Sequence, residues 1–224
     1  MFHDFLNADE VSEVRSLTDS LSGYNAHVPV FSDGVKRKYD SEYEFNTLSY
    51  SPEEFFQNKT LLEKMTNPYI TSLVQSYLQC YPTLYSLNCW WHKFSSKSYN
   101  MTQSTHRDYD DFKFLAFFIY LTDVDDGNGP HVFYPKTHGG KDGSEQIAIK
   151  GKAGTAILAD TYALHRGQPL EKGERLLIWW RYGLYVNEVH FHNKEYLYKV
   201  DSNNVFDKIS DNQHNRHLLR AFLK

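Results

Sequence analysis

Thr105-His106-Arg107-Asp108 is the stretch that decides how this chain folds. Two later features belong with it, the segment Ala163-Leu164-His165-Arg166-Gly167 and Arg175, ten residues after His165. Together they offer two imidazoles, one carboxylate and one guanidinium. Two imidazoles and one carboxylate on paired strands can cap one face of an octahedral iron(II) and leave three coordination positions open.

The spacing of these residues predicts strands. Residues two apart on a strand project from the same face, so His106 and Asp108 are predicted to point to one side and Arg107 to the other. His165 follows a strand-like run over residues 155–159, and in a barrel of antiparallel strands it can return beside Asp108. A His-x-Asp pair alone is a weak signal. The distal His-Arg-Gly and the arginine after it make the pattern specific.

A different motif shares the letters His-Arg-Asp, namely the catalytic loop of protein kinases. That loop needs an asparagine five positions after the aspartate to hold magnesium. Lys113 occupies this position, and the sequence has neither an Asp-Phe-Gly motif nor a glycine-rich loop. The kinase interpretation therefore fails.

Length, charge and cysteine content limit the class of protein. A chain of 224 residues suits a single domain with a full core. Its formal net charge of −4 predicts no nucleic-acid surface, so a small-molecule or protein substrate is expected. No membrane span or signal peptide is expected either. Cys80 and Cys89 lack disulfide or zinc spacing and are predicted to be buried free thiols of a cytoplasmic protein.

Helix signals occupy the first third of the chain, and strand signals follow. Asn7 and Glu10 form a capping-box-like start to a helix over about 8–21. Prolines open two further predicted helices, near 52–65 and 68–80. From Thr83 the pattern changes to β-prone runs separated by turn clusters. These runs cover residues 83–94, 112–122, 132–134, 145–149, 154–159 and 175–185.

Helices first and short strands afterwards predict a mainly β fold with α, an antiparallel barrel or double-sheet roll backed by N-terminal helices. We expect one domain over residues 1–224. It would comprise a helical part (about 1–82), a strand core (about 83–185) and a C-terminal extension (about 186–224). The apolar end of that extension suits a short packing helix or a partner-facing element.

Several ordered segments carry a family resemblance. They are Gln103–Asp108, Phe118–Val124, Asn128–Pro130 leading to Pro135–His138, His165–Gly167, and Arg175. Together, over roughly residues 83–185, they resemble the phytanoyl-CoA dioxygenase family of iron(II)/2-oxoglutarate oxygenases. The resemblance implies a double-stranded β-helix (jelly-roll, cupin-like) core with Fe(II) on His106, Asp108 and His165. It also implies 2-oxoglutarate, bound to the metal through its C1 carboxylate and keto oxygen, as co-substrate with O2.

Arg175 then has a chemical role, because a guanidinium is a planar two-pronged donor for the distal C5 carboxylate of 2-oxoglutarate. Arg181 lies on the same strand face, but about 20 Å further along at ~3.3 Å per residue. Only one of the two can serve the co-substrate, and the distance from His165 favours Arg175. Tyr120, on the strand after the His-x-Asp segment, is predicted as a second co-substrate contact, with core packing as the alternative.

The other histidines are interpreted as non-ligands. His138 occupies the turn that matches the family's Pro-Gly-Ser-His segment, which it follows only in part, and is predicted to stabilise that loop. His92 is predicted to support or line the pocket. His190 and His192 are interpreted as surface or hinge residues.

Asp108 also bears on the reaction type. In relatives that halogenate, a small residue replaces this carboxylate, so the resemblance implies hydroxylation or a related oxidation, with release of succinate and CO2. The expected substrate is a small polar metabolite or natural-product intermediate. Two alternatives stay open. One is a non-catalytic jelly-roll protein that binds a metal or ligand, and the other is a zinc hydrolase, since two histidines and one carboxylate also suit zinc.

Overall fold

The computed structural model describes residues 1–25, 32–40, 47–94, 103–140, 143, 145–184 and 199–224. Its helices are α1 (Ala8–Ser20), the 3-10 helix η2 (Pro52–Gln57), α2 (Lys59–Met65), α3 (Pro68–Leu78), the 3-10 turn η4 (His138–Gly140), α4 (Ser202–Phe206) and α5 (Gln213–Leu219). Its strands are β1 (Ser22–Tyr24), β2 (Lys36–Lys38), β3 (Thr47–Ser49), β4 (Thr83–Lys93), β5 (Phe114–Tyr120), β6 (His131–Phe133), β7 (Ile147–Ile149), β8 (Ala156–Ala159), β9 (His165–Gly167) and β10 (Glu174–Gly183).

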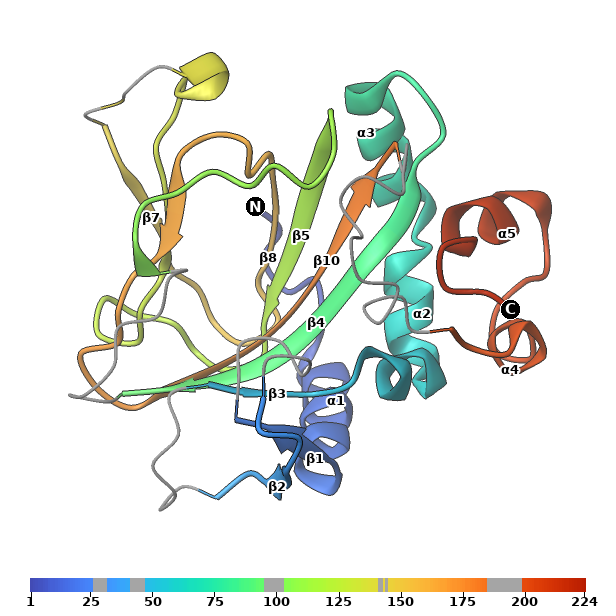
Figure 1. Cartoon of the computed structure of the whole chain (residues 1–224), viewed down its shortest axis with the longest axis horizontal. Coiled ribbons are helices and arrows are strands. Elements are labelled where there is room, and N and C mark those ends of the chain that lie inside the picture. The colour runs from blue at the N-terminus through green and yellow to red at the C-terminus, as the bar shows by residue number, and fades with distance from the viewer. Residues whose placement is uncertain (26–31, 41–46, 95–102, 141–142, 144, 185–198) are drawn as a thin grey trace.

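Two antiparallel sheets form the centre of the molecule. Within the described residues, the larger sheet has the strand order β2-β1-β3-β4-β10-β5-β8 and the smaller the order β7-β6-β9. In Figure 1 the smaller sheet lies on the left of the long strands β4, β5 and β10, and α2 and α5 lie on their right. The mainly β jelly-roll architecture predicted from the sequence is confirmed.

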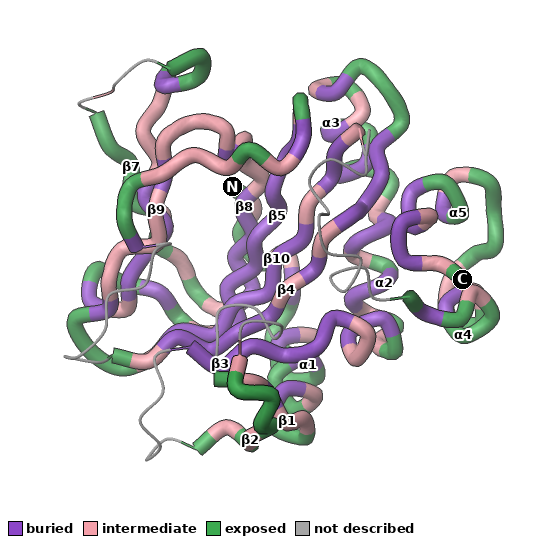
Figure 2. The backbone as a smooth tube through the Cα atoms, in the orientation of Figure 1, coloured by how far each residue is buried: buried purple, intermediate pink, exposed green. Residues whose placement is uncertain are grey.

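The long central strands are mostly apolar on both faces because both faces are covered, apart from the polar residues that line the cavity between the sheets. Along β10, Leu176, Ile178 and Trp180 belong to the core that includes the helices. Leu177 and Trp179 belong to a second cluster, shared with Phe133 of β6, between the two sheets. This follows from the alternation of side chains along a strand. Figure 2 accordingly shows β4, β5 and β10 buried along most of their length.

The N-terminal third differs from the predicted helical part. It contributes β1, β2 and β3 to the larger sheet, and the helix predicted near 52–65 is divided into η2 and α2. Asn58 separates these two, because its side chain accepts the Leu61 N–H at 2.8 Å and so begins a new helix. Strands of three residues carry too little periodicity to be recognised in a sequence.

The C-terminal segment is a packing element. Leu218, Leu219, Ala221 and Phe222 are all buried, and the Phe222 ring lies 4.7 Å from that of Phe56. The apolar end of this tail therefore packs against the rest of the chain, as the first of the two alternatives predicted. Tyr185, His190 and His192 lie outside the described residues.

Two predictions about smaller features have different outcomes. Cys89 is buried, as predicted, but Cys80 is exposed because it follows the last turn of α3 at the surface. None of the helices in the described part of the chain combines the length and apolar character of a membrane span.

Candidate metal centre

The fold brings His106, Asp108 and His165 together. Each offers one ligand atom, and these atoms all lie within 4.8 Å of one another. Asp108 Oδ1 is 3.7 Å from His106 Nε2, and Asp108 Oδ2 is 3.5 Å from His165 Nε2. Two nitrogens and a carboxylate at such separations can hold a divalent transition metal.

Only one of the three residues lies on a strand of a sheet. His165 opens β9, whereas His106 is held by an isolated pair of backbone hydrogen bonds to His165, of 2.9 and 3.0 Å. Asp108 lies in irregular backbone and donates its N–H to Thr161 O at 2.9 Å. The strand predicted for His106 and Asp108 is therefore wrong, although their side chains do meet.

Both imidazoles present the same nitrogen to the centre. His106 Nδ1 lies 2.7 Å from Ser104 O, and His165 Nδ1 lies 3.0 Å from Ala163 O. A carbonyl oxygen can only accept, so each Nδ1 carries the proton and each Nε2 keeps its lone pair. Such backbone partners fix the tautomer and orientation of metal-binding histidines. With both Nε2 lone pairs free to coordinate, these residues have the chemistry that a metal ion requires.

The charge states also suit metal binding. Burial lowers the pKa of His165 to about 4, so this imidazole is neutral at pH 7. Burial by itself would raise the pKa of Asp108, but the positive charge of Arg181 and the neighbouring imidazoles outweigh it and lower that pKa below its ordinary value. A neutral imidazole and an ionised carboxylate are the forms that bind metals.

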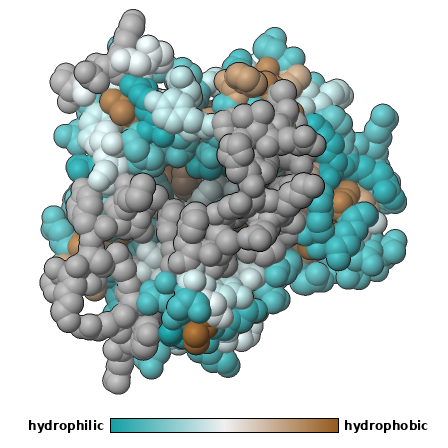
Figure 3. Space-filling model, in the orientation of Figure 1, coloured by the Kyte–Doolittle hydropathy of each residue, from teal (hydrophilic) through white to brown (hydrophobic). Residues whose placement is uncertain are grey.

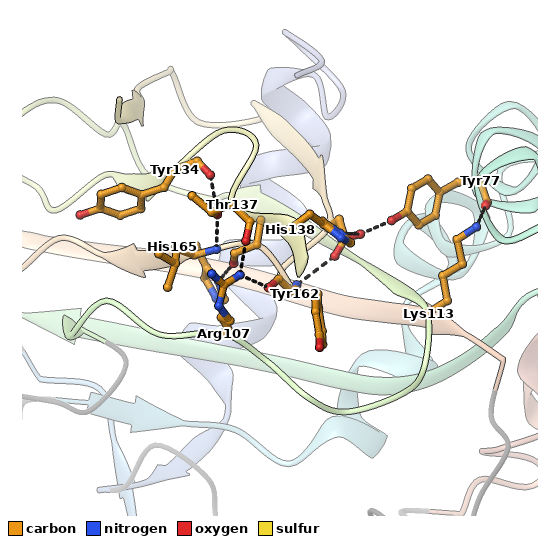
Figure 4. Close-up of polar contacts among 11 residues, drawn as sticks. Tyr77, Arg107, Lys113, Tyr134, Thr137, His138, Tyr162 and His165 are labelled. Atoms are coloured by element: carbon orange, nitrogen blue, oxygen red, sulfur yellow. Dashed lines mark hydrogen bonds and ion pairs between the residues drawn. The ribbon is translucent and has the colours of Figure 1, made fainter. Parts of the chain in front are cut away.

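Thr137 and Arg107 lock the segments that carry the candidate ligands (Figure 4). The Thr137 hydroxyl donates to Tyr134 O at 2.7 Å and accepts the Leu164 N–H at 2.8 Å. Arg107 donates to the backbone oxygens of Thr137 and of Tyr162. Arg107 thus points away from the centre, as its place between His106 and Asp108 predicted, and ties that segment to the loop before His165.

Replacing Thr137 with valine is expected to lower the free energy of unfolding by about 1–3 kcal/mol, because the partly buried Leu164 N–H loses its acceptor. Urea denaturation of the metal-free protein measures this. Thr137→Ser keeps the hydroxyl and serves as the control. Equal stability of the valine and serine variants would contradict the role of this hydrogen bond.

His138 stabilises the loop in which it lies. His138 and Tyr77 both donate to Asp160, and Asp160 Oδ1 accepts the Tyr162 N–H at 2.9 Å (Figure 4). These bonds join η4 and α3 to the loop that leads into His165. The arrangement agrees with the interpretation of His138 as a loop-stabilising residue.

The candidate ligands line a cavity between the two sheets, together with other polar and aromatic side chains. Its lining includes His106, Asp108, His165 and Arg175, and aromatic side chains form much of the remaining wall, namely Trp90, Phe118 and Trp179. Figure 3, viewed as Figure 1, shows a largely hydrophilic surface with a small apolar area recessed near its centre. The site therefore combines a polar metal-binding group with an apolar interior.

Arg175 is a buried cation with donors to spare. Its residue is 1% exposed, and one terminal nitrogen donates to His92 Nδ1 at 2.8 Å. Nε and Nη1 have no hydrogen-bond partner within the part of the chain that the structure describes. Burial lowers the pKa of Arg175 to about 10, so it remains charged at pH 7. A buried guanidinium with two unused donors is a receptor for a carboxylate. His92, interpreted from the sequence as supporting the pocket, lines the same cavity.

The Tyr120 hydroxyl is used within the protein. It donates to Ile149 O at 3.0 Å and accepts the His131 N–H at 3.0 Å, so it joins the larger sheet to β6 and β7. The described cavity wall includes His131 but not Tyr120. Contact between Tyr120 and a co-substrate stays a prediction. Sequence reasoning missed His131, although it directly follows the Asn128–Pro130 segment of the resemblance.

His131 gives the protein a predictable pH dependence. Burial, followed by the charge of Arg175, lowers the pKa of His131 well below its ordinary value. The unfolded chain takes up a proton near pH 6.5 and the folded protein does not, so the free energy of unfolding falls as the pH drops below about 6.5. His131→Asn is expected to reduce this slope by up to about 1.4 kcal/mol per pH unit. Urea denaturation at pH 7, 6 and 5 measures it, and identical slopes would contradict it.

Arg181 is a second site residue to which sequence reasoning assigned no role. It lies at the metal centre, with Nη2 2.6 Å from Asp108 Oδ2, and its Nη1 pairs with Asp110. The i, i+2 alternation along β10 was the available signal, because it places Arg175 and Arg181 on one face. The two residues lie six positions apart on β10 and line the same cavity, where they have different partners.

No protein-family model matches the chain, and no curated protein matches it. Solved structures do match. One is the non-heme alpha-ketoglutarate-dependent epimerase SnoN from nogalamycin biosynthesis, with 16% identity and a TM-score of 0.58 over 81% of this chain and 76% of that chain. A second is HygX from Streptomyces hygroscopicus with nickel and 2-oxoglutarate bound, with 13% identity and a TM-score of 0.57 over 83% and 82%.

A third is the non-heme alpha-ketoglutarate-dependent carbocyclase SnoK from nogalamycin biosynthesis, with 16% identity and a TM-score of 0.55 over 79% of this chain and 76% of that chain. At these identities the likeness concerns the fold and not the reaction. The chain has the jelly-roll fold of non-heme alpha-ketoglutarate-dependent enzymes.

Proposed function

We propose that this protein is an Fe(II)- and 2-oxoglutarate-dependent oxygenase of the phytanoyl-CoA dioxygenase type, which hydroxylates a small molecule. His106, Asp108 and His165 would hold the iron, and Arg175 would hold the C5 carboxylate of 2-oxoglutarate. When bound, iron with 2-oxoglutarate and O2 supplies an oxidant for an unactivated C–H bond and yields succinate and CO2. The residues of the chain would bind and orient the substrate and co-substrate and exclude water from the site.

The observation that carries this proposal is the guanidinium of Arg175, which lies in the same cavity as the three candidate ligands and whose Nε and Nη1 have no partner among the described residues. A hydrolytic zinc site needs three protein ligands and a water. It has no use for a buried cation with two unused donors. A dicarboxylate that reaches the metal with one end and Arg175 with the other would use both features.

The apolar wall has its own part in the reaction. Trp90, Phe118 and Trp179 line the cavity around the polar centre and would exclude water from it once substrate binds. Exclusion of water strengthens the electrostatic attraction between Arg175 and a bound carboxylate and protects reactive species from side reactions. Tyr120 supports this wall through its bonds to β6 and β7.

Hydroxylation and a natural-product substrate are the finer parts of the proposal. Among proteins with this fold, one is described as an epimerase and one as a carbocyclase, and HygX was also solved with hygromycin B bound. The carboxylate of Asp108 favours hydroxylation over halogenation, because it occupies the position that a halide would need. A small polar metabolite or natural-product intermediate suits a cavity with aromatic walls and a charged centre.

Anaerobic addition of Fe(II) and 2-oxoglutarate to the metal-free protein is expected to produce a weak visible charge-transfer band. On exposure to air, a substrate library is expected to contain compounds that stimulate succinate release. A band without succinate under any substrate would favour the non-catalytic binding protein. No band in folded protein, together with tight zinc binding, would favour the hydrolase.

A further inference from the structure

Arg181 forms two ion pairs with the segment that carries Asp108. Its Nη2 lies 2.6 Å from Asp108 Oδ2, and its Nη1 pairs with Asp110 in the same segment. The guanidinium carbon lies 4.5 Å from the centre of the Trp179 ring, so the ring fixes one face of the group. The Arg181 side chain is only 15% exposed. It is therefore a mostly buried guanidinium that pairs with two carboxylates.

The strand that carries Arg181 is paired on both sides, whereas the segment that Arg181 binds is not part of a sheet. β10 is paired on both sides, and Arg181 lies opposite Ser86 of β4 and Ala116 of β5. Asp108 and Asp110, in contrast, lie in irregular backbone between the His106–His165 bridge and β5. No strand ladder fixes Asp108 within this described segment, so side-chain contacts must supply the precision that a metal ligand needs.

Arg181 and Arg175 have different hydrogen-bond partners. Both terminal nitrogens of Arg181 already bind carboxylates. Among the described residues, Arg175 has no partner for its Nε and one terminal nitrogen, whereas Arg181 lacks one for its Nε alone. Arg181 is thus committed to the protein, and Arg175 is open to a ligand.

We propose that Arg181 is a positioning residue for the metal centre, which holds Asp108 by one carboxylate oxygen so that the other is presented to the metal. The inference rests on the proposed function. It implies that the Arg181–Asp108 bond persists when metal binds and that Asp108 contributes one oxygen only, which leaves coordination positions for the co-substrate and oxygen. The rival view is that Arg181 competes with the metal for Asp108. The two views predict opposite changes in metal affinity when Arg181 is replaced.

The test is manganese(II) affinity in the absence of co-substrate, measured from the electron paramagnetic resonance signal of free manganese(II). Arg181→Met is expected to weaken binding about 10–100-fold, the usual effect of removing a residue that orients a metal ligand. Unchanged or tighter binding would overturn the proposal, because competition predicts a gain. Arg216→Met is the matched control: it breaks an exposed pair with Asp211, at 2.5 and 2.6 Å, on α5. Its affinity should equal that of the wild type.

A purely structural role for Arg181 is distinguished by circular dichroism. Such a role would lower the free energy of unfolding and leave the manganese(II) affinity of the folded protein unchanged, so affinity is measured where each variant is fully folded. If Arg181→Met does not fold, Arg181→Lys replaces it in the test, since lysine keeps the positive charge but lacks the two-pronged guanidinium. About tenfold weaker binding supports the proposal, and wild-type affinity overturns it. A wild type that binds no manganese(II) would instead refute the proposed function.

Discussion

Replacing His106 with alanine is expected to weaken manganese(II) or iron(II) binding at least about 100-fold and to abolish succinate formation. Loss of a residue that merely orients a ligand costs about 10–100-fold, and loss of the ligand itself should cost more. Among the two histidines His106 is the better target. Its side chain is 29% exposed, whereas that of His165 is 6% exposed, so its removal disturbs the core less.

The fold should survive this change. The two backbone hydrogen bonds between residues 106 and 165 do not involve the imidazole, and Asp108 keeps its bond to Thr161. Titration with manganese(II) and a urea denaturation curve on the same preparation separate loss of the site from loss of the fold. His3→Ala, at an exposed position near the N-terminus, is the control for loss of an imidazole. Wild-type affinity in a folded His106→Ala protein would show that the metal does not use this triad.

Replacing Arg175 with methionine is expected to weaken co-substrate binding strongly and to change the stability of the ligand-free protein little. Two charge-assisted hydrogen bonds of about 1.5–3 kcal/mol each would be lost from 2-oxoglutarate, so its affinity for the manganese-loaded protein should fall roughly 10²–10⁴-fold. In the ligand-free protein, the removal of buried donors that have no partner among the described residues offsets the loss of the hydrogen bond to His92, so the free energy of unfolding should change by no more than about 1 kcal/mol.

Calorimetric titration of the manganese-loaded protein with 2-oxoglutarate, and urea denaturation without ligand, measure the two effects. Saturation of the wild type at about 100 times its dissociation constant should raise its stability by about 2.7 kcal/mol, and Arg175→Met should lack this gain. Arg37→Met, which breaks an exposed pair with Asp33, is expected to change stability by no more than about 0.5 kcal/mol. Wild-type affinity for 2-oxoglutarate in Arg175→Met would place the distal carboxylate elsewhere.

The long elements could be predicted from the sequence because their signals are local. The capping box of Asn7 and Glu10 opens α1, and Asn67 with Pro68 opens α3. β4, β5 and β10 lie within the predicted β-prone runs to within a few residues. Their residues are apolar along the chain itself, because one side packs on helices and the other faces the second sheet.

The short elements could not be predicted, because their strength comes from partners far away in the sequence. β1, β2 and β3 have three residues each, and the pairing of Thr47 with His92 joins β3 to β4 across the N-terminal helices. β9 begins at His165 and exists through its pairing with β6. Such pairings leave no periodic trace within a three-residue run.

The sequence by itself determined the chemistry of the candidate centre. His106, Asp108 and His165 are defined by residue type and spacing, and the coordinating atoms belong to the side chains themselves. Only the tertiary structure decided how those atoms are held. The Ser104 and Ala163 carbonyls select Nε2 of each imidazole, and Arg181 fixes Asp108 from a strand that comes much later in the chain. Tautomer, charge and orientation depend on distance and burial, which the folded backbone sets and which no short stretch of sequence contains.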